Sequence, residues 1–324
     1  MRPALAAAVV VIVAAAVPPV ASAHVGRSLP VATSFTARIT GSVAGVRARV
    51  VDGDQTLWLQ TAADVLVPGT LGEPLLRFDR DGVWLNLHSP TAQSDRIDRF
   101  DLQPSANPHA KPLWHRVSAG HSYAWHEHRL HALEPLARSA GAVGPWSVPL
   151  VVDGRRQRLH GVLDYRPPGR TWAWIAAASV LAAAAAAVAT RSRAGLVAFA
   201  LAATPVIWAL RIGRELYGRP TVPTVGWIEI ALTSVIGAVL VYGLVNRSDG
   251  TPVFTAFLVG FGGLYEGLTM LPLLTHAIVL SDLPSIVARV GEVLTLGAGI
   301  GALLGSIFGQ LRLSEAGIDS SGAA

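Results

Sequence analysis

Residues 166–189 read RPPGRTWAWIAAASVLAAAAAAVA, and this stretch divides the chain into two parts of different character. Arg166-Pro167-Pro168-Gly169 is typical of a linker, because proline and glycine interrupt regular structure. The apolar run that follows is long enough to cross the ~30 Å hydrocarbon core of a bilayer as a helix. Most charged residues precede this stretch, and long apolar runs follow it. The sequence therefore predicts a polar domain joined to a membrane domain.

The C-terminal part is predicted to be a membrane domain of about five helices over residues 172–311, with a cytoplasmic tail over 312–324. The candidate spans are 172–190, 194–212, 224–245, 252–280 and 284–311. Trp172, Trp174 and Trp227 lie near expected helix ends, where indole rings favour the membrane interface. The whole chain of 324 residues is 51% hydrophobic and 15% charged, too apolar for an ordinary soluble protein.

The last span carries Gly297, Gly301, Gly305 and Gly309. Glycine at every fourth residue leaves a smooth groove along one helix face and lets a neighbouring helix approach closely. We expect this face to serve helix packing.

The expected membrane helices also contain ionisable and soft side chains, which are costly in hydrocarbon and are therefore candidates for function. These residues are Arg211, Glu215, Glu229, Glu266, Met270, His276, Arg289 and Glu292. Arg289 and Glu292 are spaced for an ion pair within one helix, and Glu266 and Met270 lie one turn apart. Two interpretations stay open: a buried ion-pair network that fixes the bundle, or a Glu/Met/His relay that receives an ion from the domain before it.

A signal peptide is predicted at residues 1–23. Arg2 gives it a positive start, and Ala4–Val17 is an apolar stretch too short for a comfortable membrane span. Ala21-Ser22-Ala23 matches the small-x-small pattern of signal peptidase sites, so cleavage would make His24 the first residue of the mature chain. An uncleaved anchor is the alternative. Export would place the next domain outside the cytoplasm. Together with the expected membrane helices, it predicts a multi-pass protein of the cell membrane.

Residues 24–168 are predicted to form an extracytoplasmic, all-β sandwich of the immunoglobulin or cupredoxin kind, because short strand-like runs recur about every ten residues. The runs are Thr36–Ile39, Val46–Val51, Thr56–Gln60, Leu75–Phe78, Val83–Leu87, Trp146–Val152 and Leu159–Tyr165. Three Asp-Gly pairs, at Asp52-Gly53, Asp81-Gly82 and Asp153-Gly154, predict hairpin turns, since glycine accepts the positive φ that such turns need.

The composition excludes several classes of function. Cysteine is absent, which excludes disulfides, thiolate zinc sites, iron–sulfur clusters and thiol nucleophiles. The net charge of +5 comes almost wholly from arginine, and no basic run supports nucleic-acid binding. The chain has no phosphate-binding loop, dinucleotide glycine motif, zinc-protease motif or hydrolase elbow. We therefore expect a protein that is not an enzyme of these kinds.

Histidines gather before the membrane domain, and five of the ten lie within residues 114–131, WHRVSAGHSYAWHEHRLH. On a strand, His126 and His128 would lie on one face with their Cα atoms about 6.5 Å apart, and both rings could reach one metal ion. His24 could add its α-amine and its ring nitrogen, which would complete a histidine brace. Such an all-nitrogen site suits copper, because copper(II) has the highest affinity in the divalent first-row series.

His121 and His131 are reserve ligands for this site. On an unbroken strand they would point away from the face that His126 and His128 share, and would serve a structural role. Two alternatives to copper stay open: the histidines are structural groups that hydrogen-bond to the backbone, or they bind another metal.

Several segments together resemble a group of actinobacterial exported, membrane-anchored proteins. The matching segments are VVDGDQ (50–55), GEPLLRF (72–78), GVWLN (82–86), SPTAQ (89–93), SYAWHEHRLHAL (122–133) and W-x-V-P-x-x-V-D-G (146–154). The resemblance implies a shared fold and carries no activity with it.

A leading histidine with His-x-His also resembles the copper site in the amino-terminal cupredoxin domain of particulate methane monooxygenase. In that resemblance, His24, His126 and His128 take the ligand roles. The copper-resistance protein C family is similar in its leading histidine, but it pairs that residue with an Asp-x-His element, which this chain lacks. The membrane part does not match the usual copper-resistance protein D partner.

Three functions remain in view. The first is a copper-handling or copper-delivery protein, with the lipid bilayer and a copper chaperone or copper enzyme as partners. The second is a non-catalytic envelope or interaction protein whose histidines are structural. The third is a histidine-brace copper oxidase or monooxygenase.

Overall fold

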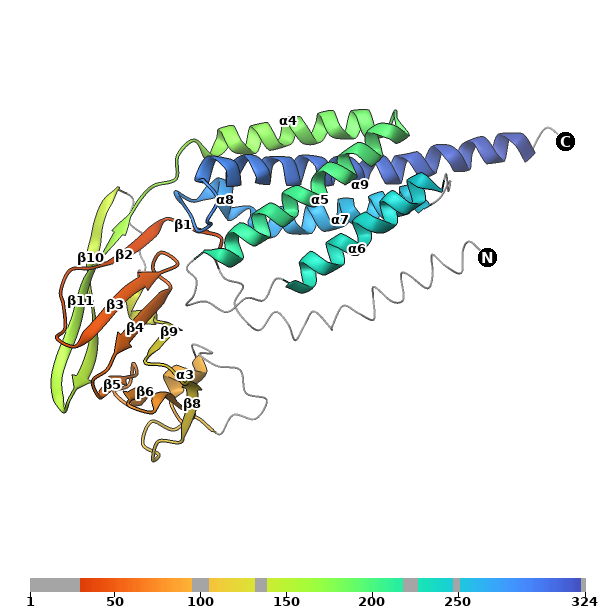
Figure 1. Cartoon of the computed structure of the whole chain (residues 1–324). Coiled ribbons are helices and arrows are strands. Elements are labelled where there is room, and N and C mark those ends of the chain that lie inside the picture. The colour runs from red at the N-terminus through yellow and green to blue at the C-terminus, as the bar shows by residue number, and fades with distance from the viewer. Residues whose placement is uncertain (1–29, 95–104, 132–138, 218–226, 247–250, 322–324) are drawn as a thin grey trace. The chain divides into compact units, whose positions relative to one another are not determined.

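The computed structural model describes residues 30–94, 105–131, 139–217, 227–246 and 251–321 (Figure 1). These residues divide into two compact units, with a boundary between Pro167 and Pro168. One is a β unit that begins at Thr33, and the other is a helical unit that also includes the segment before Thr33. Residues 1–23, which the sequence predicts to be a signal peptide, and His24 lie outside the described residues.

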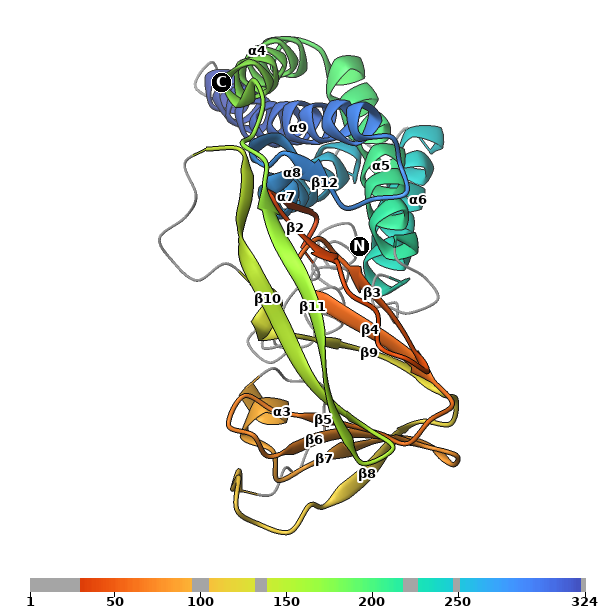
Figure 2. The ribbon, with the colours of Figure 1, turned by 90° about the vertical axis from the view of Figure 1, so that its left-hand side faces the viewer.

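The β unit consists of antiparallel strands in two sheets (Figure 2). Its elements are β2 (Phe35–Ile39), β3 (Val46–Val51), β4 (Thr56–Thr61), β5 (Val65–Pro68), β6 (Pro74–Asp79), β7 (Gly82–Asn86), α3 (Pro90–Ser94), β8 (Trp114–Ser118), β9 (Ser122–His126), η1 (His128–Leu130), β10 (Gly141–Val152) and β11 (Arg155–Tyr165). The larger sheet has the order β2-β11-β10-β5-β6-β7-β8, and the smaller has the order β3-β4-β9. The expectation of an antiparallel β domain before the membrane part is confirmed.

Side chains from both sheets form the core of the β unit. Leu57 and Leu59 of β4 and Val148 and Leu150 of β10 alternate with more exposed neighbours, and all four belong to one buried cluster. This alternation follows from the two-residue period of a strand, which sends successive side chains to opposite faces. Six of the seven expected strand-like runs lie within strands, and Val83–Leu87 extends one residue beyond β7, whereas β5, β8 and β9 were not anticipated.

The Asp-Gly turns take the backbone conformation that their glycines permit. Gly53, Gly82 and Gly154 have φ of +76°, +134° and +76°. Asp52 and Asp153 also have positive φ, as a type I′ turn requires of both central residues. The three predicted hairpin turns are therefore confirmed, between β3 and β4, β6 and β7, and β10 and β11.

The helical unit contains five longer helices and one short one among the residues described. They are α4 (Thr171–Ala189), α5 (Arg193–Leu216), α6 (Trp227–Val245), α7 (Thr251–Met270), α8 (Pro272–Thr275) and α9 (Ser285–Ser321). The short strands β1 (Ala32–Thr33) and β12 (Ile278–Val279) form a separate two-stranded sheet. Helix α9 runs through most of the expected C-terminal tail.

Four helical segments in the described residues are long and apolar enough to cross a membrane. They are Thr171–Ala189, Ala194–Leu216, Val253–Thr275 and Ser285–Phe308. In α6 the apolar stretch that lies within the described residues covers Ser234–Gly243, so the described residues contain four of the five expected spans. The expected span over 252–280 ends at Thr275 instead. It is interrupted after Met270, where Pro272, which has no backbone N–H, begins the short helix α8.

The glycine face of α9 packs against α4, as expected from its four-residue spacing. A Cβ atom added at Gly297, Gly301 or Gly305 would overlap atoms of α4. The opposing residues are Leu181, Ala185 and Ala189, in that order. Close backbone approach therefore holds these two helices together, as in other membrane helix pairs that meet at small residues.

Candidate metal centre

Strand β9 ends at His126, and the chain then turns instead of continuing as a strand. His126 is paired in register with Thr56 of β4, and the next N–H, that of Glu127, donates to the carbonyl of Gln55. The η1 turn starts at His128, and the Glu127 side chain caps it by accepting from the N–H of Arg129. The fully buried Leu130 fixes the turn in the core.

The expectation that His126 and His128 share one face of an unbroken strand is therefore wrong. The 3₁₀ turn replaces the two-residue period of a strand, and it carries the chain back towards the end of β9. The expectation that His131 points away is wrong for the same reason. His131, the first residue after the turn, lies beside His126.

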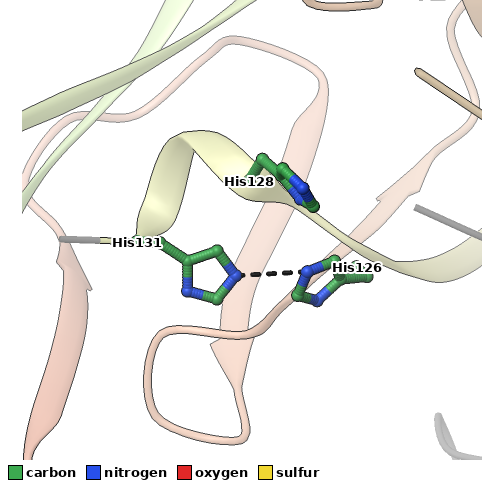
Figure 3. A group of neighbouring side chains, drawn as sticks. All are labelled: His126, His128 and His131. Atoms are coloured by element: carbon green, nitrogen blue, oxygen red, sulfur yellow. Dashed lines mark hydrogen bonds between the residues drawn. The ribbon is translucent and has the colours of Figure 1, made fainter. Parts of the chain in front are cut away.

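Three imidazoles converge at this turn (Figure 3). One ring nitrogen each from His126, His128 and His131 can be chosen so that all three lie within 4.8 Å of one another. The ring centroid of His126 is 4.9 Å from that of His128 and 4.8 Å from that of His131. The Nε2 atoms of His126 and His131 are 3.2 Å apart.

These distances suit a shared metal ion with small side-chain adjustments. Imidazole nitrogens bind zinc at about 2.0–2.1 Å, so two ligands at a tetrahedral angle lie about 3.4 Å apart. The His126–His131 separation is already close to this value. His128 offers one ring nitrogen within 4.8 Å of the nitrogens that the other two histidines offer.

Asp54 supports the ring of His131 from behind. The buried Asp54 carboxylate has its Oδ2 atom 3.2 Å from His131 Nδ1, and its Oδ1 atom accepts from Gln55 Nε2 at 3.1 Å. Gln55 Nε2 also lies 3.3 Å from the same ring nitrogen, but Nδ1 cannot donate to one neighbour while it accepts from the other. The shorter, charge-assisted contact favours donation from Nδ1 to Asp54. The lone pair of His131 is then on Nε2, which faces His126.

A second carboxylate fixes the turn but is not available as a ligand. Glu127 is buried, and its Oε2 atom accepts from Trp125 Nε1 at 3.0 Å. Arg129 donates to both carboxylate oxygens of Glu127 at 2.6 Å and to the carbonyl of Pro68 at 3.0 Å. This clamp ties η1 to β9 and β5, and it neutralises the charge of Glu127.

Other residues predicted for the site lie elsewhere or are not described. His24 is outside the described residues. His121 is exposed in the turn before β9, where its carbonyl accepts from the N–H of Thr61, and it is not part of the cluster. Sequence reasoning missed Asp54 and Gln55, because their position opposite β9 depends on strand pairing and leaves no local signal.

The polar residues of the helical unit form separate groups. Arg211 of α5 donates from Nε and Nη2 to the two carboxylate oxygens of Glu266 on α7, each at 2.8 Å. Met270 is buried among apolar side chains that include Leu210 and Leu273. The side chain of Glu229 lies outside the described residues. Arg211 is thus committed to Glu266, across two helices.

The expected ion pair between Arg289 and Glu292 is not found. Arg289 donates instead to the carbonyls of His276 and Ala277, at 2.8 and 3.1 Å. Both carbonyls lie in the segment that follows the end of α8 at Thr275, outside any helix.

No family model, no curated protein and no solved structure matches the chain.

Proposed function

We propose that this is a membrane-anchored, extracytoplasmic copper-binding protein that handles or delivers copper. The observation that carries the proposal is the convergence of His126, His128 and His131 at the end of β9, with Asp54 behind His131. The proposed domain is a sandwich of the cupredoxin or immunoglobulin kind. Two antiparallel sheets around one core support that assignment.

The donor set favours copper over other ions. Three imidazoles and no thiolate suit copper, zinc and nickel, whereas calcium and magnesium prefer oxygen. Copper(II) binds nitrogen sites more tightly than the other divalent first-row ions. The carboxylate behind His131 supports the assignment, because metal-bound histidines commonly donate their second N–H to such a group.

The three histidines form the centre of the proposed site, and His24 is proposed as an additional ligand. Cleavage after Ala23 would give the mature chain a free α-amine next to the imidazole of His24, and both groups can bind copper(II). An extra residue placed before His24 would remove that contribution and leave the three-histidine centre intact.

The proposed location rests on the signal-like N-terminus and on the four apolar helices. The helices anchor the copper-binding domain in the cell membrane, with the domain outside the cytoplasm. A copper chaperone or copper enzyme at that surface is the expected partner. The distribution of polar groups in the helical unit supports an anchor more than a copper path, since one buried methionine is a small supply of soft ligands.

Competition for copper between the purified full chain and a chromogenic chelator tests the proposal. We expect His126→Ala, His128→Ala and His131→Ala each to weaken copper binding by more than ~10-fold. Loss of a group that only supports a ligand already costs about 10-fold or more, and loss of a direct ligand should cost more than that. His115→Ala, which removes an exposed imidazole from β8, is the matched control and should bind copper as the parent does. Equal affinity in all four variants would contradict the proposal.

A structural role for the histidines is the second candidate. The hydrogen bonds that link Asp54, His131 and His126 favour it, because they can hold the turn without a metal. In that case His131→Ala would lower the melting temperature equally with copper and with chelator. Under the copper proposal, copper raises the melting temperature of the parent chain and not that of the variant.

A further inference from the structure

Glu292 of α9 is sealed inside the helical unit. The residue is 0% exposed, and neither of its carboxylate oxygens has a hydrogen-bond partner among the described residues. The hydroxyl of Thr295, one turn along the helix, donates to the carbonyl of Gly291 and so does not serve the carboxyl group.

Small residues bring α7 and α9 into close contact near Glu292. A Cβ atom added at Gly263 of α7 would lie 2.9 Å from Gly299 of α9, and one added at Gly267 would overlap Leu296. The backbones of α7 and α9 therefore approach closely near Glu292, and this contact leaves little room for water.

The nearest acidic group already has its cation. Glu266 receives both of its 2.8 Å hydrogen bonds from Arg211, so this pair is neutral as a whole. Glu266 precedes Gly267, which packs against Leu296 of α9, one helical turn from Glu292. An ionised Glu292 would thus be a second negative charge beside a cation that is already paired, and a buried, uncompensated charge costs several kcal/mol.

An ionised Glu292 would therefore need one positive charge beside it. A proton can supply this charge without any further ligand. A hard metal cation would need several oxygen ligands at once. The nearby hydroxyls of Thr269 and Thr295 both donate to carbonyls of their own helices, and the helix contacts around Glu292 are made by glycine and leucine.

We infer that Glu292 is a proton-binding site of the helical unit, where the carboxyl group is neutral while α7 and α9 remain in contact. Release of the proton leaves a charge that the closed bundle cannot solvate, so ionisation requires the contact to open. Protonation of Glu292 is thereby coupled to the packing of α7 against α9. This inference does not depend on copper binding.

The other titratable groups on the surrounding elements include Arg289, Arg214, Glu215, His276 and Tyr265. Arg289, on α9 itself, donates to two carbonyls, and Arg214 of α5 lies over the ring of Tyr217. His276, after α8, has its Nδ1 atom 3.0 Å from the hydroxyl of Thr275. Helix α4 contains no titratable side chain. Tyr265 of α7 is largely exposed.

Infrared spectroscopy of the full chain in lipid nanodiscs tests the inference directly. A neutral carboxyl group has a C=O stretching band that an ionised one lacks. We expect this band at neutral pH in the parent chain, its loss in Glu292→Gln, and its retention in Asp282→Asn, which alters an exposed acid of the same unit. A band that persists in Glu292→Gln, or that is missing from the parent, would overturn the inference.

Thermal unfolding distinguishes a bound proton from a bound metal cation. Glutamine copies the neutral acid, so Glu292→Gln should melt at the parent temperature or above it. Glu266→Gln should melt lower, because it leaves Arg211 without its carboxylate. If sodium or potassium raises the melting temperature of the parent but not that of Glu292→Gln, the ligand is a metal cation and the inference is wrong.

Discussion

The carboxylate of Asp54 lies 3.2 Å from Nδ1 of His131 and directs the opposite nitrogen of that ring towards His126. Asp54 lies in the β3–β4 turn, 77 residues before His131. The pairing of β4 with β9 brings the two residues together. The orientation of one imidazole thus depends on the register of the smaller sheet.

The first prediction concerns this contact. Asp54→Asn keeps the shape of the side chain but removes the charge that holds the His131 N–H. Copper affinity should fall by about 10- to 100-fold, the usual effect of losing an outer-shell partner. Chelator competition measures the change, and Asp81→Asn, in an exposed turn, is the control. Unchanged copper affinity in Asp54→Asn would show that Asp54 does not support the metal site.

The second prediction concerns the clamp between Glu127 and Arg129. Among the described residues, Arg129 is the arginine that pairs with the buried carboxylate of Glu127. Arg129→Met removes this partner, and an uncompensated buried charge costs about 3–5 kcal/mol. The free energy of unfolding, followed by tryptophan fluorescence, should fall by that order. Arg80→Met breaks the exposed contact with Asp81 and should change it by less than ~0.5 kcal/mol. Equal effects of the two substitutions would refute the structural role of the clamp.

The third prediction is a pH dependence that originates at Glu73. This buried carboxylate accepts from the hydroxyl of Ser89 at 2.7 Å and from the N–H groups of Thr91 and Leu71. Burial by itself would raise the pKa of Glu73, but the hydrogen bonds from Ser89 and Thr91 outweigh it and lower the pKa below its ordinary value.

Because its folded-state pKa is depressed, Glu73 stabilises the fold above its unfolded pKa of about 4.3. This contribution is lost as the pH falls through the folded-state value. The stability difference between the parent and Glu73→Gln should therefore be full at neutral pH and shrink below about pH 4. Chemical unfolding at a series of pH values measures it, and a difference that stays constant with pH would contradict this assignment.

The fourth prediction concerns the contact between α4 and α9. Gly301→Ala places a methyl group against Ala185, and such overpacking typically costs about 1–3 kcal/mol. Gly262→Ala on α7 meets no atom within 4 Å and should be neutral or slightly stabilising, because alanine favours a helix. Melting temperatures of the two variants in the same detergent compare the sites. A lower melting temperature for Gly262→Ala than for Gly301→Ala would be the contrary result.

Local patterns in the sequence predicted much of the fold and part of the site. The hairpin turn at Asp52-Gly53 and the glycine face of α9 follow from backbone sterics, and both are found. The position of His131 could not be predicted, because it depends on a turn capped by Glu127 and on burial of Leu130 in a core built by distant strands.

The same distinction holds in the helical unit. Residue spacing suggested a pair between Arg289 and Glu292, but spacing within one helix does not reveal competing partners on others. The segment after α8 supplies carbonyl acceptors to Arg289, and Arg211 pairs with Glu266 across 55 residues of chain. The isolation of Glu292 is therefore a tertiary property.

The most direct test of the copper proposal is electron paramagnetic resonance of the full mature chain titrated with copper(II). The account predicts one tightly bound copper(II) ion per chain, with a nitrogen splitting pattern that loses a contribution in each of His126→Ala, His128→Ala and His131→Ala. The pattern should be unchanged in His115→Ala. A parent spectrum that matches free copper(II), or one that survives removal of His126 and His131 together, would contradict it.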